Sequence, residues 1–469
     1  MMMPTEMIPA EVHSTRIRSD RRLHILVVTG SYAPDQSGMA PLNTELCEHL
    51  ASRGHRVSVA TGFPHYPNWK VPEAYRRKLW QRETHNGVTI HRGYIFVPAQ
   101  PTTVRRILYD ASIGLSTALR GLPIRNVDLV LAVSPPLQAG LAGYLLARLK
   151  GAPLVFQIKD LVPDLAVALG MLRNRWAIRL ARALENSVYR RADAILVICE
   201  GFRANLLAKG VPESKISLIP DWVNTRFIRP ITPPDGFRRT HNLGEAHFLI
   251  LHTGSMGAKQ KLENALAAAA ELREEQGILF CLVGDGAEKN GLQEYARSLA
   301  LSNVRFLPLQ AREALPGMLS AADVLLLNQS AQLVDMVIPS KLLIYMAAGR
   351  PVVASVATNS EAAQCIRRAS CGLVVEPENP TALAEAIRLL YANRSLAERL
   401  GARGRLFAEQ HFASDHVFHL YENLFLSLSK KKRKMYRSHE LQEESKSSGD
   451  AGGKLRGNGW RPGGETQAR

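Results

Sequence analysis

Two loops in the second half of the chain carry glycines and lysines that together could bind a diphosphate. Each follows an apolar segment that predicts a buried strand: HTGSMGAKQK contains Gly254 and Lys259, and VGDG contains Gly284 and Gly286. Glycines let the backbone approach a ligand closely, although either loop taken alone also fits an ordinary turn. Because the carboxyl ends of parallel strands meet at one edge of a sheet, the two loops can line one site.

A third loop points to the same chemistry. Residues 337–355, VIPSKLLIYMAAGRPVVAS, predict a loop, a short helix and a buried strand. Pro339 suits the first helical turn, and Gly349 suits the position where the helix stops. Ser340 and Lys341 therefore lie at a helix N-terminus, where free N–H groups and the helix dipole favour a phosphate.

The first half of the chain has two further segments of this kind. The loop GSYAPDQSGMA places Gly38 before a predicted helix, and QIKDLVPD ends a predicted strand with Lys159, Asp160 and Asp164. These charges either act on a ligand or serve the next helix, because Asp160 or Asp164 could cap its N-terminus. The sequence contains no G-x-G-x-x-G, Walker A or D-x-D motif. We therefore expect neither a bound dinucleotide nor an essential metal.

Length and charge limit the class of protein. A chain of 469 residues is too long for one ordinary core, so we expect two domains. The formal net charge is +17, and residues 430–469 contribute eleven Lys or Arg against five Asp or Glu. A basic protein attracts nucleic acid, acidic membrane surfaces or phosphorylated small molecules, and the charge alone does not choose among them.

The cysteines and the hydrophobic segments indicate where the protein works. The five cysteines form no C-x-x-C pair, which argues against a disulfide framework and a structural zinc site. Residues 1–22 lack the apolar centre of a signal peptide, and no stretch reaches the 18 apolar residues of a membrane-spanning helix. We expect a cytoplasmic protein that could lie peripherally on the inner face of the membrane.

A basic amphipathic helix is predicted over residues 173–191. Trp176, Leu180 and Leu184 recur at helical spacing between arginines. Either this helix packs on a sheet with its arginines in solvent, or it contacts an anionic membrane surface. The run KKKRKMYR at 430–437 either adds to that contact or is a solvated tail.

Apolar strands alternate with amphipathic helices along most of the chain, which predicts doubly wound, parallel α/β domains. The proline-rich stretch PDWVNTRFIRPITPPDG interrupts this series and reads as a linker. A cleft between the two domains is the expected site. The predicted segments are a flexible N-terminal segment (1–22), a Rossmann-like domain (23–219), an interdomain linker (220–236), a second Rossmann-like domain with terminal helices (237–428) and a disordered basic tail (430–469).

The chain resembles the family-4 glycosyltransferases of the GT-B fold, two Rossmann-like domains facing across a cleft. The resemblance covers about residues 23–428 and is carried by SYAPDQSGMAPLNTELCEHLASRGHRVSVAT, IPDWVN, GSMGAKQKLENAL, VGDG and PSKLLIYMAAGRPVVAS. Among these enzymes it is most similar to bacterial exopolysaccharide enzymes of the colanic-acid fucosyltransferase and fucosamine-transferase type. The resemblance implies transfer of a sugar from a nucleotide-sugar donor, with retention of configuration and without metal or cofactor. It also implies a glycan acceptor linked to a polyprenyl diphosphate.

The same resemblance assigns roles to residues. Lys259 and Lys341 would stabilise the charge on the departing nucleoside diphosphate, and Asp160 would contact the acceptor as a catalytic group. Gly38 and Lys159 would lie on the acceptor side. The residues implied for donor binding are Gly254, Ser340, Lys341, Gly284, Gly286 and Asp335.

One position departs from the family pattern. Family members commonly have two glutamates separated by seven residues, and the second would fall at Ile344, which cannot accept hydrogen bonds from a ribose. The first would fall at Met336, next to Asp335. We expect Asp335 or backbone groups to hold the ribose instead.

Two other functions fit parts of the sequence. Nucleotide-sugar 2-epimerases share the two-domain architecture, but they need no acceptor. A nucleic-acid-binding protein would explain the charge of +17, yet the chain has no recognisable binding-fold signature. We therefore expect a glycosyltransferase and do not expect nucleic acid as a partner.

Overall fold

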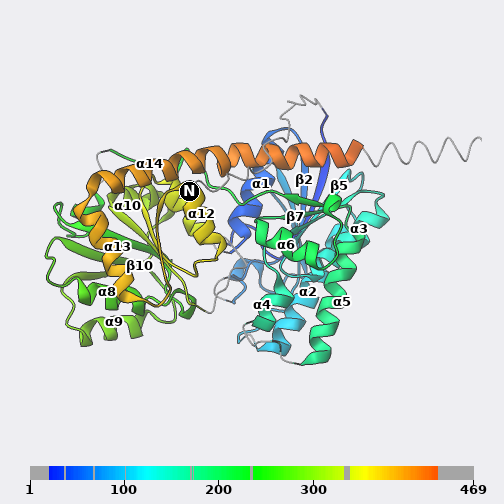
Figure 1. Cartoon of the computed structure of the whole chain (residues 1–469). Coiled ribbons are helices and arrows are strands. Elements are labelled where there is room, and N and C mark those ends of the chain that lie inside the picture. The colour runs from blue at the N-terminus through cyan, green and yellow to red at the C-terminus, as the bar shows by residue number, and fades with distance from the viewer. Residues whose placement is uncertain are drawn as a thin grey trace, which may run out of the picture.

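The computed structural model describes residues 21–35, 38–66, 69–100, 102–168, 172, 174–232, 236–331 and 339–430. Two α/β domains lie side by side, each built on its own sheet (Figure 1). The expected flexible segment 1–22 lies outside the described residues except for its last two, and the expected tail 430–469 lies outside except for Lys430. Asp335 also lies outside them.

The N-terminal domain has an eight-stranded sheet in the order β3-β4-β2-β1-β5-β6-β7-β8. The central strands are buried throughout, because helices cover both faces of the sheet. Its strands are β1 (His24–Val28), β2 (Arg56–Gly62), β3 (Trp80–His85), β4 (Val88–Gly93), β5 (Leu129–Ser134), β6 (Leu154–Ile158), β7 (Ala194–Val197) and β8 (Ile216–Leu218). Its helices are α1 (Ala40–Ser52), α2 (Thr103–Gly121), α3 (Gln138–Leu149), α4 (Val162–Ala168), α5 (Arg175–Arg191) and α6 (Glu200–Ala208).

The expected parallel sheet is confirmed except at one edge. The segment between β2 and β4 contains β3, which pairs antiparallel with β4 from Trp80 opposite Gly93 to His85 opposite Val88. The side chains of β3 are exposed or half-buried. Backbone pairing with β4 holds this edge strand, so it needs no buried side chains. Its sequence therefore shows no alternation of apolar and polar residues.

The C-terminal domain has a six-stranded parallel sheet in the order β11-β10-β9-β12-β13-β14. The chain order reverses between β9 and β12, so the loops after these two strands meet at a topological switch point. Its strands are β9 (Phe248–Ser255), β10 (Ile278–Asp285), β11 (Val304–Leu307), β12 (Val324–Asn328), β13 (Val352–Ser355) and β14 (Gly372–Val375). Its helices are α7 (Phe237–Thr240), α8 (Glu263–Glu271), α9 (Lys289–Ser298), α10 (Leu315–Ala321), α11 (Ser340–Ala347), α12 (Glu361–Ala369), α13 (Pro380–Ala392) and α14 (Arg394–His411).

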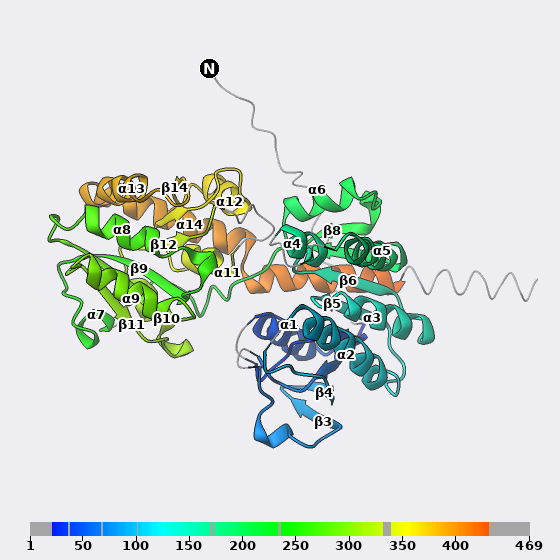
Figure 2. The same cartoon turned by 90° about the horizontal axis from the view of Figure 1, so that it is seen from below.

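The last helix of the described chain, residues 414–430, returns to the N-terminal domain. It follows α14 and crosses from one domain to the other (Figures 1 and 2). Phe418, Tyr421 and Phe425 are buried in the cluster that also holds Trp222 and the core of β1 and α1. The expected end of the C-terminal domain at 428 is therefore wrong, because helical periodicity reveals an apolar face but not which sheet that face covers.

Candidate functional site

The glycines at the ends of β9 and β10 are required by the close approach of these two strands. Gly284 pairs with Gly254, and a Cβ atom on Gly284 would lie only 1.8 Å from the carbonyl oxygen of Gly254. A Cβ atom on Gly286 would lie 2.4 Å from the carbonyl oxygen of Met256. The backbone approach that we expected toward a ligand is thus first an approach between strands. It leaves the pair of residues before the last pair of the two strands without side chains.

The side chain of Lys341 lies over this edge. It starts from the first turn of α11, and a Cβ atom on Gly254 would lie 3.0 Å from Lys341 Cε. Gly254 has φ +101°, so glycine fits there on both counts. The structure therefore brings together Gly254, Gly284 and Lys341, which the sequence places far apart.

Among the described residues, no carboxylate forms an ion pair with the half-buried Lys341 ammonium. Its Nζ atom lies 3.4 Å from Nε2 of the buried His252. Burial lowers the pKa of Lys341 to about 8, and burial together with the Lys341 charge lowers the pKa of His252 to about 3. His252 is therefore neutral at pH 7. An incoming anion would therefore stabilise the Lys341 cation, because the neutral His252 beside it supplies no opposite charge.

Tyr345 fixes the position of α11 against β9. Its buried hydroxyl accepts a hydrogen bond from the backbone N–H of Thr253 at 3.1 Å and lies 3.3 Å from Thr253 Oγ1. Ile344, the preceding residue, packs against the hydrophobic core. The sequence did not predict a role for Tyr345 or His252. The only sign was that each is a side chain with a polar atom within an otherwise apolar segment.

The start of α11 adds backbone donors to the site. Pro339 occupies the N-cap position, and no described side chain caps the helix. Ser340 follows as the first helical residue and is exposed. Lys341 follows in the same first turn, and the free N–H groups of a helix start suit a phosphate.

Lys259 lies in the loop after β9, in a short 3₁₀ helix, Ala258–Gln260, and its side chain is exposed. Its charge acts on Asp160 of the other domain. Burial raises the pKa of Asp160 to about 6, while the charges of Lys259 and Lys159 lower it. Asp160 and Lys259 therefore lie close enough for their charges to interact, although they belong to different domains.

Lys159 is committed to a different contact. It is buried, its Nζ atom pairs with Asp221 at the start of the linker, and it lies 5.1 Å from the centroid of the Trp222 ring. Asp164 likewise accepts from Lys209 at 2.7 Å. Lys159 thus anchors the linker to β6. This structural role explains why a charged residue follows the strand, and it requires no contact with a sugar acceptor.

Gly38 lies in the loop after β1, exposed and with φ +67°. Close to this loop is a buried polar group that the sequence did not reveal. The backbone N–H of His65 donates to Asp35, and His65 Nε2 lies 2.7 Å from the Tyr109 hydroxyl. Burial raises the pKa of Asp35 to about 6. Sequence reasoning missed this group because its members come from three separate segments.

Comparison with known proteins decides the family. Residues 37–222 match the family described as glycosyl transferase 4-like domain, and residues 235–407 match glycosyl transferases group 1. Over 374 residues the chain is 32% identical to a protein of Escherichia coli K12 named putative colanic acid biosynthesis glycosyl transferase WcaI. The match covers 78% of this chain and 91% of the E. coli protein. The chain belongs to this family of glycosyltransferases.

Solved structures agree with this glycosyltransferase in fold. Sucrose-phosphate synthase from Thermosynechococcus elongatus matches with a TM-score of 0.66 at 20% identity, over 87% of this chain and 100% of the synthase. Anabaena HepE in complex with UDP matches with a TM-score of 0.64 at 15% identity, over 86% of this chain and 100% of HepE. The expected GT-B fold is confirmed.

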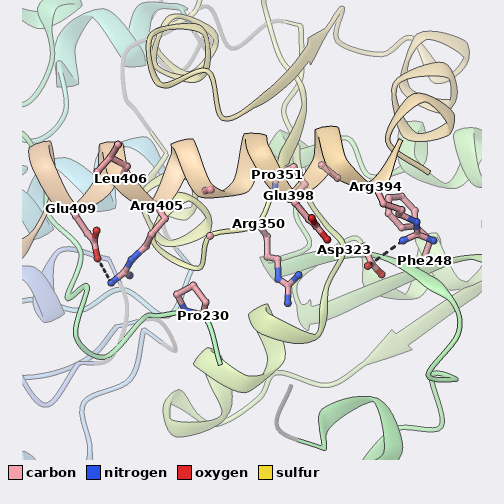
Figure 3. A pocket seen from close by; sticks show the side chains of 13 residues that line it. Pro230, Phe248, Asp323, Arg350, Pro351, Arg394, Glu398, Arg405, Leu406 and Glu409 are labelled. Atoms are coloured by element: carbon pink, nitrogen blue, oxygen red, sulfur yellow. Dashed lines mark hydrogen bonds and ion pairs between the residues drawn. The ribbon is translucent and has the colours of Figure 1, made fainter. Parts of the chain in front are cut away.

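A cavity of about 430 Å³ lies at the edge of the C-terminal sheet where the amino ends of its strands meet, in the same domain of the glycosyltransferase. Phe248, Asp323 and Pro351, which line it, stand at the amino ends of β9, β12 and β13 (Figure 3). Arg405 on its wall donates to the carbonyl oxygens of Ile228 and Ala347, so it joins the linker to the end of α11. The cavity is therefore separate from the edge that carries Lys341.

The described residues of the glycosyltransferase contain neither a candidate metal site nor a membrane-spanning helix. Within them, no group of three or more His, Cys, Asp or Glu side chains is placed to hold a metal ion. No helix of the described chain is long and apolar enough to cross a membrane.

Proposed function

We propose that this glycosyltransferase moves a sugar from a nucleotide-sugar donor, with retention of configuration, to a glycan acceptor in surface-polysaccharide or exopolysaccharide biosynthesis. The observation that carries the proposal is the half-buried Lys341 ammonium in the first turn of α11, whose side chain lies against Gly254 of β9. The name of the E. coli relative, which refers to colanic acid biosynthesis, supports the polysaccharide context. The complex of HepE with UDP supports a nucleotide as part of the donor.

The lysines would supply the electrostatic part of catalysis. When the glycosidic bond to the nucleoside diphosphate breaks, negative charge develops on the β-phosphate. Lys341, the N–H groups at Ser340 and the exposed Lys259 would stabilise that charge, which in other transferases is the task of a metal ion. We therefore propose that no metal or other cofactor takes part.

The acceptor would bind on the N-terminal side. The charges of Asp160 and Lys259 interact, so Asp160 is the carboxylate that we propose to contact the acceptor. Gly38 and the neighbouring Asp35 would line the acceptor side, whereas Lys159 would only hold the linker. Asp335 remains the proposed partner of the ribose, because Ile344 packs against the core.

We further propose a polyprenyl-diphosphate-linked acceptor and a fucosyl or fucosamine donor, both suggested by the sequence resemblance. The 2-epimerase alternative is not favoured, since the chain belongs to a transferase family. We also propose that nucleic acid is not a partner.

Thermal unfolding with a panel of UDP- and GDP-sugars tests this proposal. A true donor at 100 times its dissociation constant stabilises the protein by about 2.7 kcal/mol, so its melting temperature shifts upward while other nucleotide sugars leave it unchanged. Product analysis with the stabilising donor should show transfer only when a lipid-linked glycan is added. Conversion of the donor to its epimer without an acceptor would contradict the proposal, and so would stabilisation by none of the panel.

A further inference from the structure

Helix α2 carries a stripe of large apolar side chains that points away from the protein. Val104, Leu108, Leu115 and Leu119 follow one another at helical spacing. Their exposed fractions are 67%, 53%, 65% and 47%. An ordinary surface helix turns such a stripe toward the core, so this orientation needs a physical reason.

The opposite face of α2 explains why the stripe cannot turn inward. This face is made of small residues that fit closely against α3. A Cβ atom on Gly114 would lie 2.8 Å from the Gln138 Cβ atom, and a Cβ atom on Gly121 would lie 2.4 Å from Leu146 Cδ1. Because only glycine allows this approach, packing fixes the rotation of α2 with its leucines outward.

The apolar surface continues onto the neighbouring helices. Helix α2 packs on α3, and α3 packs on α5. On α3, Leu145 and Leu149 are exposed, and on α5 the exposed fractions of Trp176 and Leu180 are 75% and 73%. Figure 1 shows α2 and α5 together at the end of the N-terminal domain that lies away from the helix 414–430, and Figure 2 shows α2 beside α3.

The charges around this surface select its partner. Arg105 and Arg106 on α2, and Arg175 and Arg179 on α5, are exposed. The acidic residues of the two helices do not balance them: Asp110 is half-buried, and Glu185 is buried and bound to Lys209 at 2.9 Å. Two copies of so basic a surface would repel each other. Apolar side chains ringed by arginines instead suit the headgroup region of an anionic bilayer.

We propose that the outer faces of α2, α3 and α5 form a docking surface for an anionic phospholipid membrane, with α2 as the element that enters the headgroup region. The surface is broader than the α5 helix that the sequence indicated. The proposal rests on the proposed function only in its purpose, which is to bring the N-terminal domain to a lipid-linked acceptor. The leucines of α2 would insert into the headgroup region, and the arginines would give the preference for anionic lipid.

Sedimentation with vesicles tests the surface. The full chain should bind vesicles of phosphatidylcholine with 30% phosphatidylglycerol at least tenfold more strongly than vesicles of phosphatidylcholine alone. The double variant Leu108→Gln/Leu115→Gln should bind the anionic vesicles at least tenfold more weakly. Arg105→Gln/Arg179→Gln should lose about fivefold per arginine, which corresponds to about 1 kcal/mol for each basic residue at such a surface.

A matched variant on the other domain separates this effect from general damage. Leu389→Gln replaces a leucine that is 49% exposed on α13, and it should bind vesicles as the unchanged chain does. Equal vesicle binding by the α2 double variant would overturn the proposal, and so would a dimer in light scattering that this variant abolishes. Stabilisation by the donor sugar should be the same in both leucine variants. Vesicle binding without any stabilisation would therefore remove the proposed function and keep the docking surface.

Discussion

Replacing Lys341 by alanine should lower the turnover number about 10²–10³-fold, the loss found when one preorganised donor to a developing oxyanion is removed. The side chain lies over the Gly254 end of β9, and its Cε atom is 3.0 Å from where a Cβ atom of residue 254 would be. Steady-state kinetics with the donor identified by thermal unfolding measures the effect. Calorimetric titration with the nucleoside diphosphate should show weaker binding as well, since we propose that the ammonium also contacts the ground-state phosphate.

The pH dependence of diphosphate binding tests the role of the Lys341 ammonium independently. Burial lowers the pKa of Lys341 to about 8, so the free protein loses this charge as the pH rises through 8. Above that pH, binding of a diphosphate must take up a proton, and affinity should fall by up to about tenfold per pH unit. In Lys341→Ala this slope should be absent.

The control is an exposed lysine elsewhere. Lys78 is exposed in the N-terminal domain, where its Nζ atom donates to Gln81 at 3.0 Å, and Lys78→Ala should behave as the unchanged protein. If Lys341→Ala left both affinity and turnover unchanged, the diphosphate would not bind at the start of α11.

Replacing Gly284 by alanine should have the second large effect, a loss of at least about 3 kcal/mol in the free energy of unfolding. The added Cβ atom would lie 1.8 Å from the carbonyl oxygen of Gly254. That neighbour is backbone in the centre of a sheet, so β9 and β10 would have to separate at their carboxyl ends. Denaturant unfolding measures the loss, and a variant that still folds should no longer bind the nucleoside diphosphate.

Gly291 offers the matched control. It lies in α9, and a Cβ atom there would meet nothing within 4 Å. Gly291→Ala should stabilise the protein by about 0.5–1 kcal/mol, because alanine favours a helix and restricts the unfolded chain. An equally small change for Gly284→Ala would show that the two strands do not approach as closely as described.

Much of the fold could be predicted because its strands are buried on both faces. Apolar runs such as HFLILHTG at 247–254 fall within one or two residues of the observed β9. Two features could not be predicted from the sequence: the strand β3, and the sheet on which the helix 414–430 packs. The reasons differ. Strand β3 is held by backbone pairing at an exposed edge, and its side chains carry no signal. The helix 414–430 has a clear apolar face, but sequence does not show that Tyr421 and Phe425 pack on the other domain.

The candidate site was predictable where it depends on local chain geometry. The helix start at Ser340 and the turn glycines could be read from residue type and spacing. The neighbour of Lys341 could not, because His252 meets it only through the packing of α11 against β9, where the Tyr345 hydroxyl bonds Thr253. For the same reason Lys159 looked like a site residue. Its partner, Asp221, is 62 positions away in the linker.

Hydrogen exchange of the full chain with and without a nucleoside diphosphate tests the central claim most directly. The claim is that the diphosphate binds where the ends of β9 and β10 meet the start of α11. Protection should increase in peptides covering 253–261, 283–289 and 339–345, because bound phosphate oxygens engage their backbone N–H groups. Protection confined to 394–409, beside the cavity of Figure 3, would contradict the account.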